Sequence, residues 1–167
     1  MADKYDGQVH HTTQRNVTLA MPERVGVMGI VCPDEAPLLG FISTVIPAIA
    51  MGNSVVVIPS ETSPLSATDF YQILETSDVP AGCINIVTGS KDELMKEMSK
   101  HDDIDGLWYF GTAQGSKDVE LLSADNLKRT WVNNGKYRNW YDRSHGEGAE
   151  FLRHATEIKN IWVPYGA

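Results

Sequence analysis

Short apolar runs alternate along this chain with segments of helical periodicity, and this alternation restricts the possible folds more than any other feature. A helical segment between successive apolar runs is the spacing of strands that are joined by crossover helices. The predicted strands are Val25–Val31, Val55–Ile58, Ile84–Val87, Gly106–Phe110 and Arg129–Val132. The predicted helices are Leu38–Met51, Ser66–Thr76, Glu93–Lys100, Lys117–Ser123 and Glu150–Ala155. The sequence therefore predicts an α/β domain with a largely parallel sheet.

The two ends of the chain follow a different pattern. Gln8–Leu19 is polar, with its apolar residues mostly at odd positions, which is typical of a two-faced strand rather than a core strand. Such a segment does not suit a compact parallel sheet, so we expect a projecting arm or hairpin formed with a strand that starts near Glu23. Ile158–Val163 also alternates, and we expect it to be exposed or to pair with a partner.

The composition excludes several classes of protein. A length of 167 residues suits one domain, and a formal net charge of −8 argues against a general binder of nucleic acid or anionic membranes. No apolar run reaches the ~18 residues that span a bilayer. The two cysteines, Cys32 and Cys83, fit a reducing compartment, so we expect a cytoplasmic protein. Their favoured role is that of small apolar fillers rather than nucleophiles.

Candidate metal ligands are few. His10 and His11 are adjacent, and neighbours on a strand face opposite ways, so shared ligation is disfavoured. The acidic residues at 102–105 match part of a calcium loop, but His101 and Thr112 stand at its first and twelfth positions. A solvated turn is the favoured interpretation, and we expect no metal site.

A basic and aromatic stretch, Lys128–Arg143, offers two interpretations. It contains Trp131, Tyr137, Trp140 and Tyr141 among its basic residues. Such a stretch can stack on and neutralise a single nucleic-acid strand. The acidic net charge of the chain disfavours that role, so we favour a docking surface for a partner subunit or domain, where Trp, Tyr and Arg are common anchors.

Residues 24 to 68 read RVGVMGIVCPDEAPLLGFISTVIPAIAMGNSVVVIPSETSPLSAT. Without a gap, this string resembles the nucleotide-binding core of the aldehyde dehydrogenase superfamily. The resemblance continues through Val79–Gly89 and Phe110–Thr112, and Thr156–Ile161 resembles the C-terminal oligomerisation strand of the family. Ala2–Gly7 resembles a helix-ending motif that usually begins with Trp. Met1 stands in the place of that Trp, so we expect a longer protein in which this chain is one part.

The resemblance implies a fold and a set of cofactor contacts. The fold is a single domain over residues 1–167, with a Rossmann-like core at 24–136 and helices on both faces of its sheet. Oligomerisation strands are implied at 8–23 and 157–163. The matched contacts to the adenine side of NAD or NADP are Ser60, Glu61, Gly111 and Thr112. For Glu61, capping of the helix after Pro64 is an equal alternative.

The departures from the family pattern argue against catalysis. Glu35 stands where the family has an Asn that helps to hold the oxyanion, and a carboxylate there repels it. Ile58 replaces a Lys that contacts the cofactor ribose, and Val132 replaces the general base. Lys91 stands in the place of a small Gly beside the adenine. The family carries its catalytic domain, with the nucleophilic Cys, between the positions of Lys136 and Gly148, where this chain has about a dozen residues.

Three functions remain open at this stage. The first is a non-catalytic module, similar to the degenerate C-terminal copy in tandem family-16-type aldehyde dehydrogenases, which forms a homodimer or docks onto a full domain through its edge strands. The second is a working dinucleotide-binding domain of an active enzyme whose Cys lies on another segment, with weak binding of NAD or NADP. The third is an anion or single-strand binder that uses Lys128–Arg143.

Overall fold

The main sheet is parallel and has five strands in the order β5-β4-β3-β6-β7. The structure is a computed structural model, and it describes residues 5, 7–13 and 15–165. The strands are β3 (Val27–Val31), β4 (Ser54–Ile58), β5 (Ile84–Ile86), β6 (Gly106–Tyr109) and β7 (Arg129–Val132). β3 is central and pairs with β4 on one side and β6 on the other, so the predicted α/β fold with a parallel sheet is confirmed.

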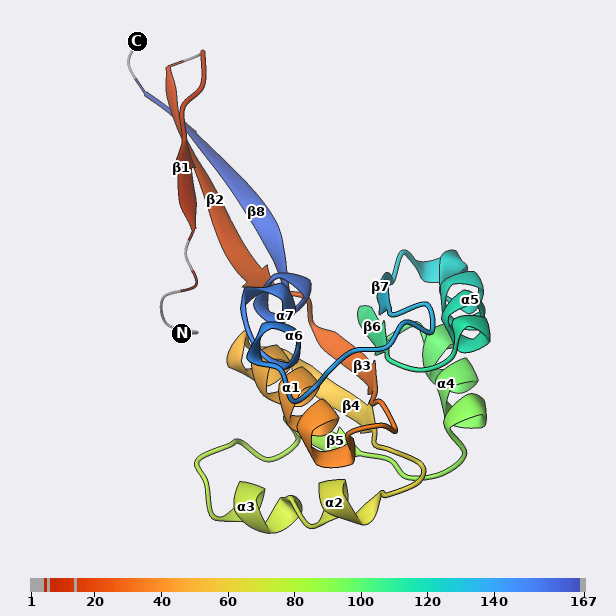
Figure 1. The fold of residues 1–167 in the computed structure, drawn as a ribbon. Coiled ribbons are helices and arrows are strands. Elements are labelled where there is room, and N and C mark those ends of the chain that lie inside the picture. The colour runs from red at the N-terminus through yellow and green to blue at the C-terminus, as the bar shows by residue number, and fades with distance from the viewer. Residues whose placement is uncertain (1–4, 6, 14, 166–167) are drawn as a thin grey trace.

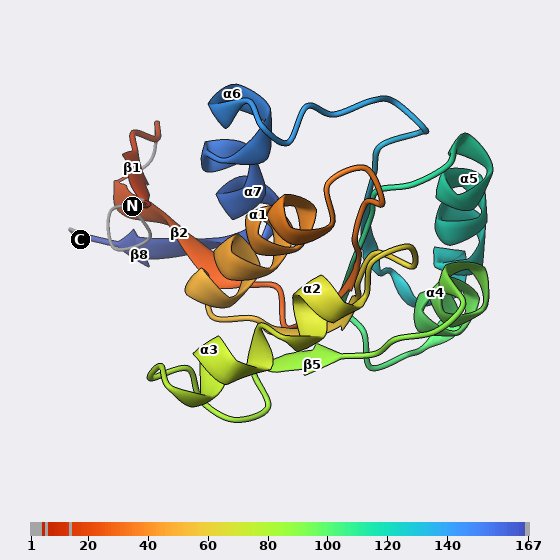
Figure 2. The same ribbon diagram turned by 60° about the horizontal axis from the view of Figure 1, so that its bottom comes forward.

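Helices lie on both faces of this sheet, and Figure 2 shows α1, α6 and α7 on one side with α4 and α5 on the other. The helices are α1 (Pro37–Ala50), α2 (Leu65–Thr68), α3 (Tyr71–Glu75), α4 (Lys91–Lys100), α5 (Ala113–Leu122), α6 (Arg143–Gly146) and α7 (Ala149–His154), with a 3-10 turn, η2, at Ala124–Asn126. Among the residues described, no helix has the length and apolar character that a membrane crossing requires.

The single helix predicted over Ser66–Thr76 is divided in the structure into α2 and α3. The two residues between these helices keep helical dihedral angles. The Phe70 N–H bonds to the Ala67 carbonyl at 3.2 Å, which is the tighter spacing of a 3-10 turn. The Thr68 hydroxyl also donates to the Leu65 carbonyl at 3.2 Å, and that carbonyl still accepts the helical bond from the Asp69 N–H at 2.9 Å. The tighter turn at Phe70 therefore interrupts a segment whose apolar spacing is helical throughout.

The sheet is buried on both faces, as the side chains of β4 illustrate. Val55 and Val57 pack with Phe41 of α1 in one apolar cluster, while Ile58 packs with Met95 of α4 in a second cluster on the opposite face. Each such side chain stabilises the fold by about 1.5–3 kcal/mol through burial. A β-branched run without polar interruptions is therefore the sequence pattern of a strand that is covered by helices on both sides.

A second sheet projects from the domain as an arm (Figure 1). It contains β1 (Gln8–His10), β2 (Asn16–Arg24) and β8 (Thr156–Pro164) in the order β1-β2-β8, and both pairings are antiparallel. β2 and β8 pair along their whole length, from Asn16 opposite Pro164 to Arg24 opposite Thr156. The predicted projecting antiparallel element with a C-terminal strand is confirmed.

The boundaries within the arm differ from the expectation. Gln8–Leu19 is two strands rather than one, because the chain turns between β1 and β2, where the Thr12 hydroxyl bonds to the Asn16 side chain. Glu23 lies near the end of β2 and does not begin a separate strand. The segment at residues 1–7 that matches the helix-ending motif lies largely outside the described residues.

A buried side chain, Asn53, which is 2% exposed, links the base of the arm to the domain. Its amide nitrogen donates to the carbonyls of Ala48, in α1, and Ala155, just before β8, at 2.9 and 2.8 Å. Its amide oxygen accepts from the Gly26 N–H, just before β3, at 2.9 Å. One amide therefore satisfies three backbone groups that are distant in the sequence, and fixes the place where the arm leaves the domain.

We predict that Asn53→Ala lowers the free energy of unfolding by about 2–3 kcal/mol, because it leaves buried backbone donors and acceptors without partners. Urea denaturation followed by circular dichroism measures the loss. The matched control is Asn160→Ala on the exposed surface of β8, for which a change within about 0.5 kcal/mol is expected. Equal effects of the two substitutions would contradict this role of Asn53.

Candidate functional site

The residues matched to cofactor contacts lie at the carboxyl edge of the main sheet. Because the strands are parallel, the segments that follow β3, β4 and β6 leave the sheet at the same edge, where α/β domains usually bind ligands. Ser60 and Glu61 follow β4, and Gly111 and Thr112 follow β6. The end of β3 lies between the two pairs, so the segment after β3 decides whether they can share a ligand.

Asp34, in the segment after β3, occupies the part of this edge beside Ser60. Its Oδ1 accepts hydrogen bonds from the Ser60 hydroxyl at 2.8 Å and from the Glu61 N–H at 2.9 Å. Its Oδ2 lies 2.7 Å from Nζ of Lys91, at the start of α4. Lys91 Nζ also donates to the Cys32 carbonyl at 2.9 Å. The Ser60 hydroxyl and the Lys91 ammonium are therefore both engaged within the protein.

The Asp34–Lys91 pair is electrostatically asymmetric. The Lys91 side chain is 8% exposed, whereas that of Asp34 is 44% exposed. Partial burial raises the pKa of Asp34, but hydrogen bonds from Lys91 and Ser60 and the charge of Lys91 outweigh it, so the pKa lies below its usual value. A buried ammonium is costly without a counter-ion, and Asp34 supplies one. The pair therefore holds α4 against the end of β3.

Glu61 acts as a helix cap. Its Oε2 accepts from the Lys91 N–H at 3.0 Å, at the first residue of α4, where a carboxylate satisfies a free N–H and interacts favourably with the positive end of the helix. The capping alternative is thus observed, on α4 instead of the helix that follows Pro64. The Glu61 carboxylate lies at the edge where a ribose would be expected, with one oxygen already bonded.

Gly111 and Thr112 are also engaged by neighbouring groups. The Thr112 hydroxyl accepts from the Gly115 N–H at 3.0 Å and caps α5, and the Gly111 N–H donates to Asn133 Oδ1 at 3.2 Å. A Cβ at Gly111 would lie 2.5 Å from the hydroxyl oxygen of Tyr109, so glycine is required by a close contact within the chain. The structural role of both residues is complete without a ligand.

The residues at the positions of family catalytic and cofactor groups have structural contacts. Glu35 Oε1 accepts from the indole N–H of Trp140 at 3.1 Å, which anchors the segment that follows β7. Ile58 is buried in the apolar cluster on the α4 face, and Val132, at the end of β7, packs against the same cluster. The structure therefore shows an acceptor and two apolar groups at the positions that the sequence resemblance matches to an amide donor, a cation and a base.

Neither cysteine is placed for chemistry at this edge. Cys32 is fully buried, and burial raises the pKa of its thiol to about 12, so the thiolate does not form near neutral pH. Cys83 directly precedes β5 and therefore lies at the amino edge of the sheet, opposite the ligand edge. Both thiols are free. The chain's two cysteines thus provide no nucleophile at the carboxyl edge.

The structure changes the interpretation of Lys128–Arg143, because its aromatic anchors fold inward. Trp140 is buried, Trp131 is half-buried, and both pack into the cluster on the α1 face. Arg138 lies between four aromatic rings, with its guanidinium carbon 4.9–5.9 Å from their centroids. The rings are Phe110, Trp131, Trp140 and Phe151. Of the predicted docking aromatics, only Tyr137 and Tyr141 are exposed.

A small cavity lies at the carboxyl edge beside Ser60 and Glu61. Its volume is about 250 Å³, below the roughly 300–1,000 Å³ that is typical of small-molecule sites. It is lined by Ser60, Glu61, Thr88 and Gly89, with two prolines, so a carboxylate but no cation faces it. Within the described part of the chain, no group of three or more His, Cys, Asp or Glu side chains could hold a metal ion.

Comparisons with known proteins agree with the resemblance found in the sequence. The family model described as "Aldehyde dehydrogenase family" matches residues 1–137. The NADP/NAD-dependent aldehyde dehydrogenase PuuC of Escherichia coli K12 is 36% identical over 134 residues, which is 80% of this chain and 27% of that protein. The chain thus spans little more than a quarter of the length of this curated relative.

Solved structures show the same partial coverage. PnpE from Pseudomonas sp. WBC-3 superposes with a TM-score of 0.75 and 27% identity, over 79% of this chain and 27% of that one. Aldehyde dehydrogenase C of Pseudomonas syringae, solved with NAD+ and octanal, gives a TM-score of 0.71 and 34% identity, over 78% and 26%. The family match covers more than half of the sequence and the fold agrees with it. The chain therefore belongs to the aldehyde dehydrogenase family.

Proposed function

We propose that this chain is a non-catalytic, aldehyde-dehydrogenase-like module that joins subunits, either as a homodimer or by docking onto a full aldehyde dehydrogenase domain within a longer chain. The observation that carries the proposal is the Asp34–Lys91 pair, which engages the polar groups of the edge where a cofactor would bind. In this proposal the module consists of a Rossmann-like core at 24–136 and interaction strands at 8–23 and 157–163.

The surroundings of the carboxyl edge support the absence of catalysis by this chain alone. Its nearest thiol, Cys32, is protonated and sealed from solvent. Glu35 is an acceptor that is already bonded to Trp140, and Val132 has no basic atom. Oxidation of an aldehyde through a covalent thiohemiacetal needs three protein groups, a nucleophile, a base and a donor for the oxyanion, in addition to a dinucleotide that accepts the hydride. None of the matched positions supplies one of these groups.

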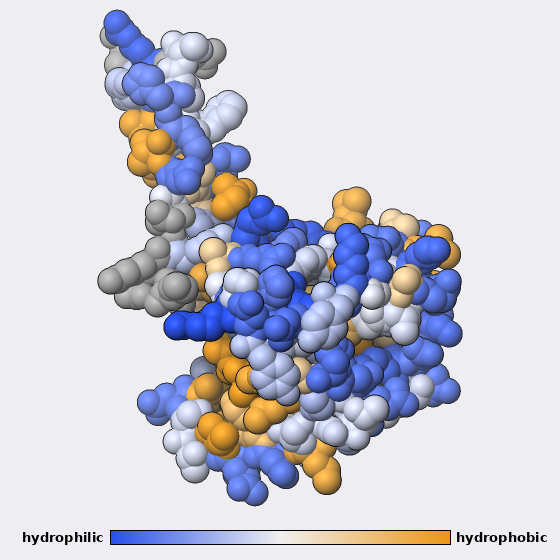
Figure 3. Space-filling view, in the orientation of Figure 1, coloured by the Kyte–Doolittle hydropathy of each residue, from blue (hydrophilic) through white to orange (hydrophobic). Residues whose placement is uncertain are grey.

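The arm supports the interaction role. Among the described strands, β8 pairs only with β2, so its outer edge offers backbone donors and acceptors along nine residues. Several large apolar or aromatic side chains of the arm are exposed. They are Val9, Val17, Met21, Ile158, Trp162, Val163 and Tyr165. Figure 3 shows separate orange patches along the arm. We assign the outer edge of β8 to a second copy of the chain. Pairing with a strand of that copy would bond the free backbone groups of β8 and cover the exposed apolar side chains.

A second function, a dinucleotide-binding domain of an active NAD(P)-dependent aldehyde dehydrogenase, is favoured by one observation. Ser60, Glu61, Gly111 and Thr112 are retained at the carboxyl edge, and a solved relative is bound to NAD+. In that function the nucleophile lies on another segment, and rearrangement of Lys91 precedes cofactor binding. The free thiols of Cys32 and Cys83 support a cytoplasmic location for either function.

Titration with NAD or NADP separates the two functions. We predict a dissociation constant of about 1 mM or weaker for the natural chain, which is roughly −4 kcal/mol. Lys91→Ala removes the bulk and the ammonium of a side chain that stands where the family has a small Gly beside the adenine, and should tighten binding at least about tenfold, as isothermal titration calorimetry would measure. Lys96→Ala, an exposed position of the same helix, is the control and should bind as the natural chain does. Micromolar binding by the natural chain would refute the first proposal.

Thiol labelling tests the burial of Cys32. We predict that Ellman's reagent modifies Cys83 in the folded chain but reaches Cys32 only after unfolding, because the Cys32 thiol is buried and protonated. The Cys83→Ser variant should therefore be unreactive until denaturant is added. Rapid labelling of that variant in buffer, with native circular dichroism retained, would show a reactive Cys32.

Light scattering tests the interaction role. We predict that the chain is a dimer at micromolar concentration, with twice the 18.4 kDa mass of one chain. The double substitution of Ile158→Lys with Trp162→Lys places charges on the edge strand, which oppose strand pairing, and should yield a monomer with unchanged circular dichroism. Leu127→Lys, at an apolar residue that is 96% exposed and lies outside the arm, is the control and should remain dimeric. A monomeric natural chain would contradict the prediction.

A further inference from the structure

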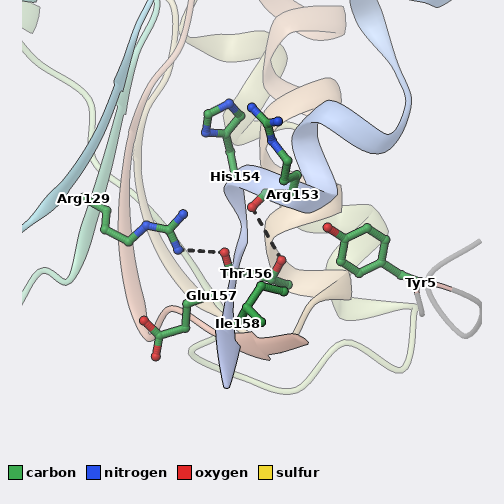
Figure 4. A pocket seen from close by; sticks show the side chains of 7 residues that line it. All are labelled: Tyr5, Arg129, Arg153, His154, Thr156, Glu157 and Ile158. Carbon is green, nitrogen blue, oxygen red and sulfur yellow. Dashed lines mark hydrogen bonds between the residues drawn. The ribbon is translucent and has the colours of Figure 1, made fainter. Parts of the chain in front are cut away.

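A cavity of about 460 Å³ lies at the foot of the arm, away from the carboxyl edge. Figure 4 shows that its walls come from three elements, with Arg129 at the start of β7, Arg153 and His154 at the end of α7, and Glu157 in β8. Tyr5 closes a further side. The volume is within the roughly 300–1,000 Å³ of small-molecule sites.

The charge of this cavity is opposite to that of the chain. Two guanidinium groups and one imidazole face a single carboxylate, Glu157, in a chain whose formal net charge is −8. The positive charges around the cavity also affect the protonation of His154. Its pKa is lowered by burial and by the positive charges of Arg153, Arg129 and Arg138, against a smaller opposing effect of Glu150. The cavity is therefore a local positive site where an anion is favoured.

Two of the side chains that line the cavity, Arg129 and His154, are held in place before any ligand arrives. Arg129 Nη1 donates to the Thr156 carbonyl at 2.7 Å, which fixes its guanidinium and leaves other N–H groups available. The His154 ring stacks on Trp131 with centroids 3.9 Å apart and an interplanar angle of 6°. Arg153 is exposed and forms no ion pair with any described residue. Arg129 is therefore preorganised, and Arg153 has no ion pair to break, so both lower the free-energy cost of binding an anion.

We propose that this cavity binds the phosphate group of a small organic phosphate. Two guanidinium groups match the charge of a phosphate dianion, and the planar fork of each suits paired hydrogen bonds to its oxygens. The imidazole and the remaining volume accommodate the organic part. Because Arg129 belongs to the main sheet while Thr156 begins β8, the bound phosphate also fastens the arm to the domain. The proposal does not depend on dinucleotide binding at the carboxyl edge.

The test uses the natural chain and inorganic phosphate as the probe. Calorimetric titration and thermal unfolding are measured with phosphate and with sodium chloride of equal ionic strength, since a ligand of the folded state raises its unfolding temperature. Arg153→Gln removes the unpaired guanidinium and should weaken phosphate binding at least about tenfold. Lys117→Gln, an exposed basic residue of α5, removes the same charge far from the cavity and should leave phosphate binding unchanged.

Each outcome decides the proposal. Saturable binding of phosphate that is lost in Arg153→Gln and kept in Lys117→Gln supports it. Equal weakening in both variants overturns it, because general charge attraction then explains the binding. Absence of phosphate binding by the natural chain overturns it as well. Citrate that binds as tightly as phosphate at equal ionic strength overturns the assignment to phosphate and shows a carboxylate site.

Discussion

The ammonium of Lys91 is the charge around which the ligand edge of this domain is organised. A cation with so little access to water needs a counter-ion and hydrogen-bond acceptors, and the end of β3 provides both through Asp34 and the Cys32 carbonyl. Asp34 in turn accepts hydrogen bonds from the Ser60 hydroxyl and the Glu61 N–H, while the Glu61 carboxylate accepts one from the first N–H of α4. Four groups that could each contact a ligand therefore satisfy one another. A ligand at this edge therefore competes with these bonds for the Lys91 ammonium and the Ser60 hydroxyl.

Much of the architecture could be predicted from the sequence, because the decisive interactions are local or periodic. Runs such as Val55–Ile58 predict strands that are covered on both faces, and helices between successive strands predict that the sheet is parallel. The alternation in Ile158–Val163 likewise indicates the exposed β8. The division of Ser66–Thr76 was not predictable from periodicity, since it lies in a tighter turn, where the Phe70 N–H bonds to the Ala67 carbonyl.

The candidate site was predictable as a set of positions but not as a set of contacts. The match placed Ser60 and Glu61 at a strand end, as observed, and flagged Lys91 where a small residue is usual. The partner of Lys91 lies in a segment 57 positions earlier, and no local pattern connects the two. The same limit applies to Arg138, since two of its four rings, Phe110 and Phe151, lie outside the basic and aromatic stretch. The sequence pattern of an aromatic and basic stretch is the same whether its side chains face solvent or the core.

The unbroken pairing of β2 with β8 has a mechanical consequence. Nine paired residues at about 3.3 Å each give a stiff lever of roughly 30 Å, anchored at its base by the amide of Asn53. A force on the arm near Pro164 is therefore transmitted to the C-terminal turn of α1 and the first residues of β3, because no flexible linker lies between them and the arm. The orientation of whatever grips the tip is thereby coupled to the orientation of the whole domain.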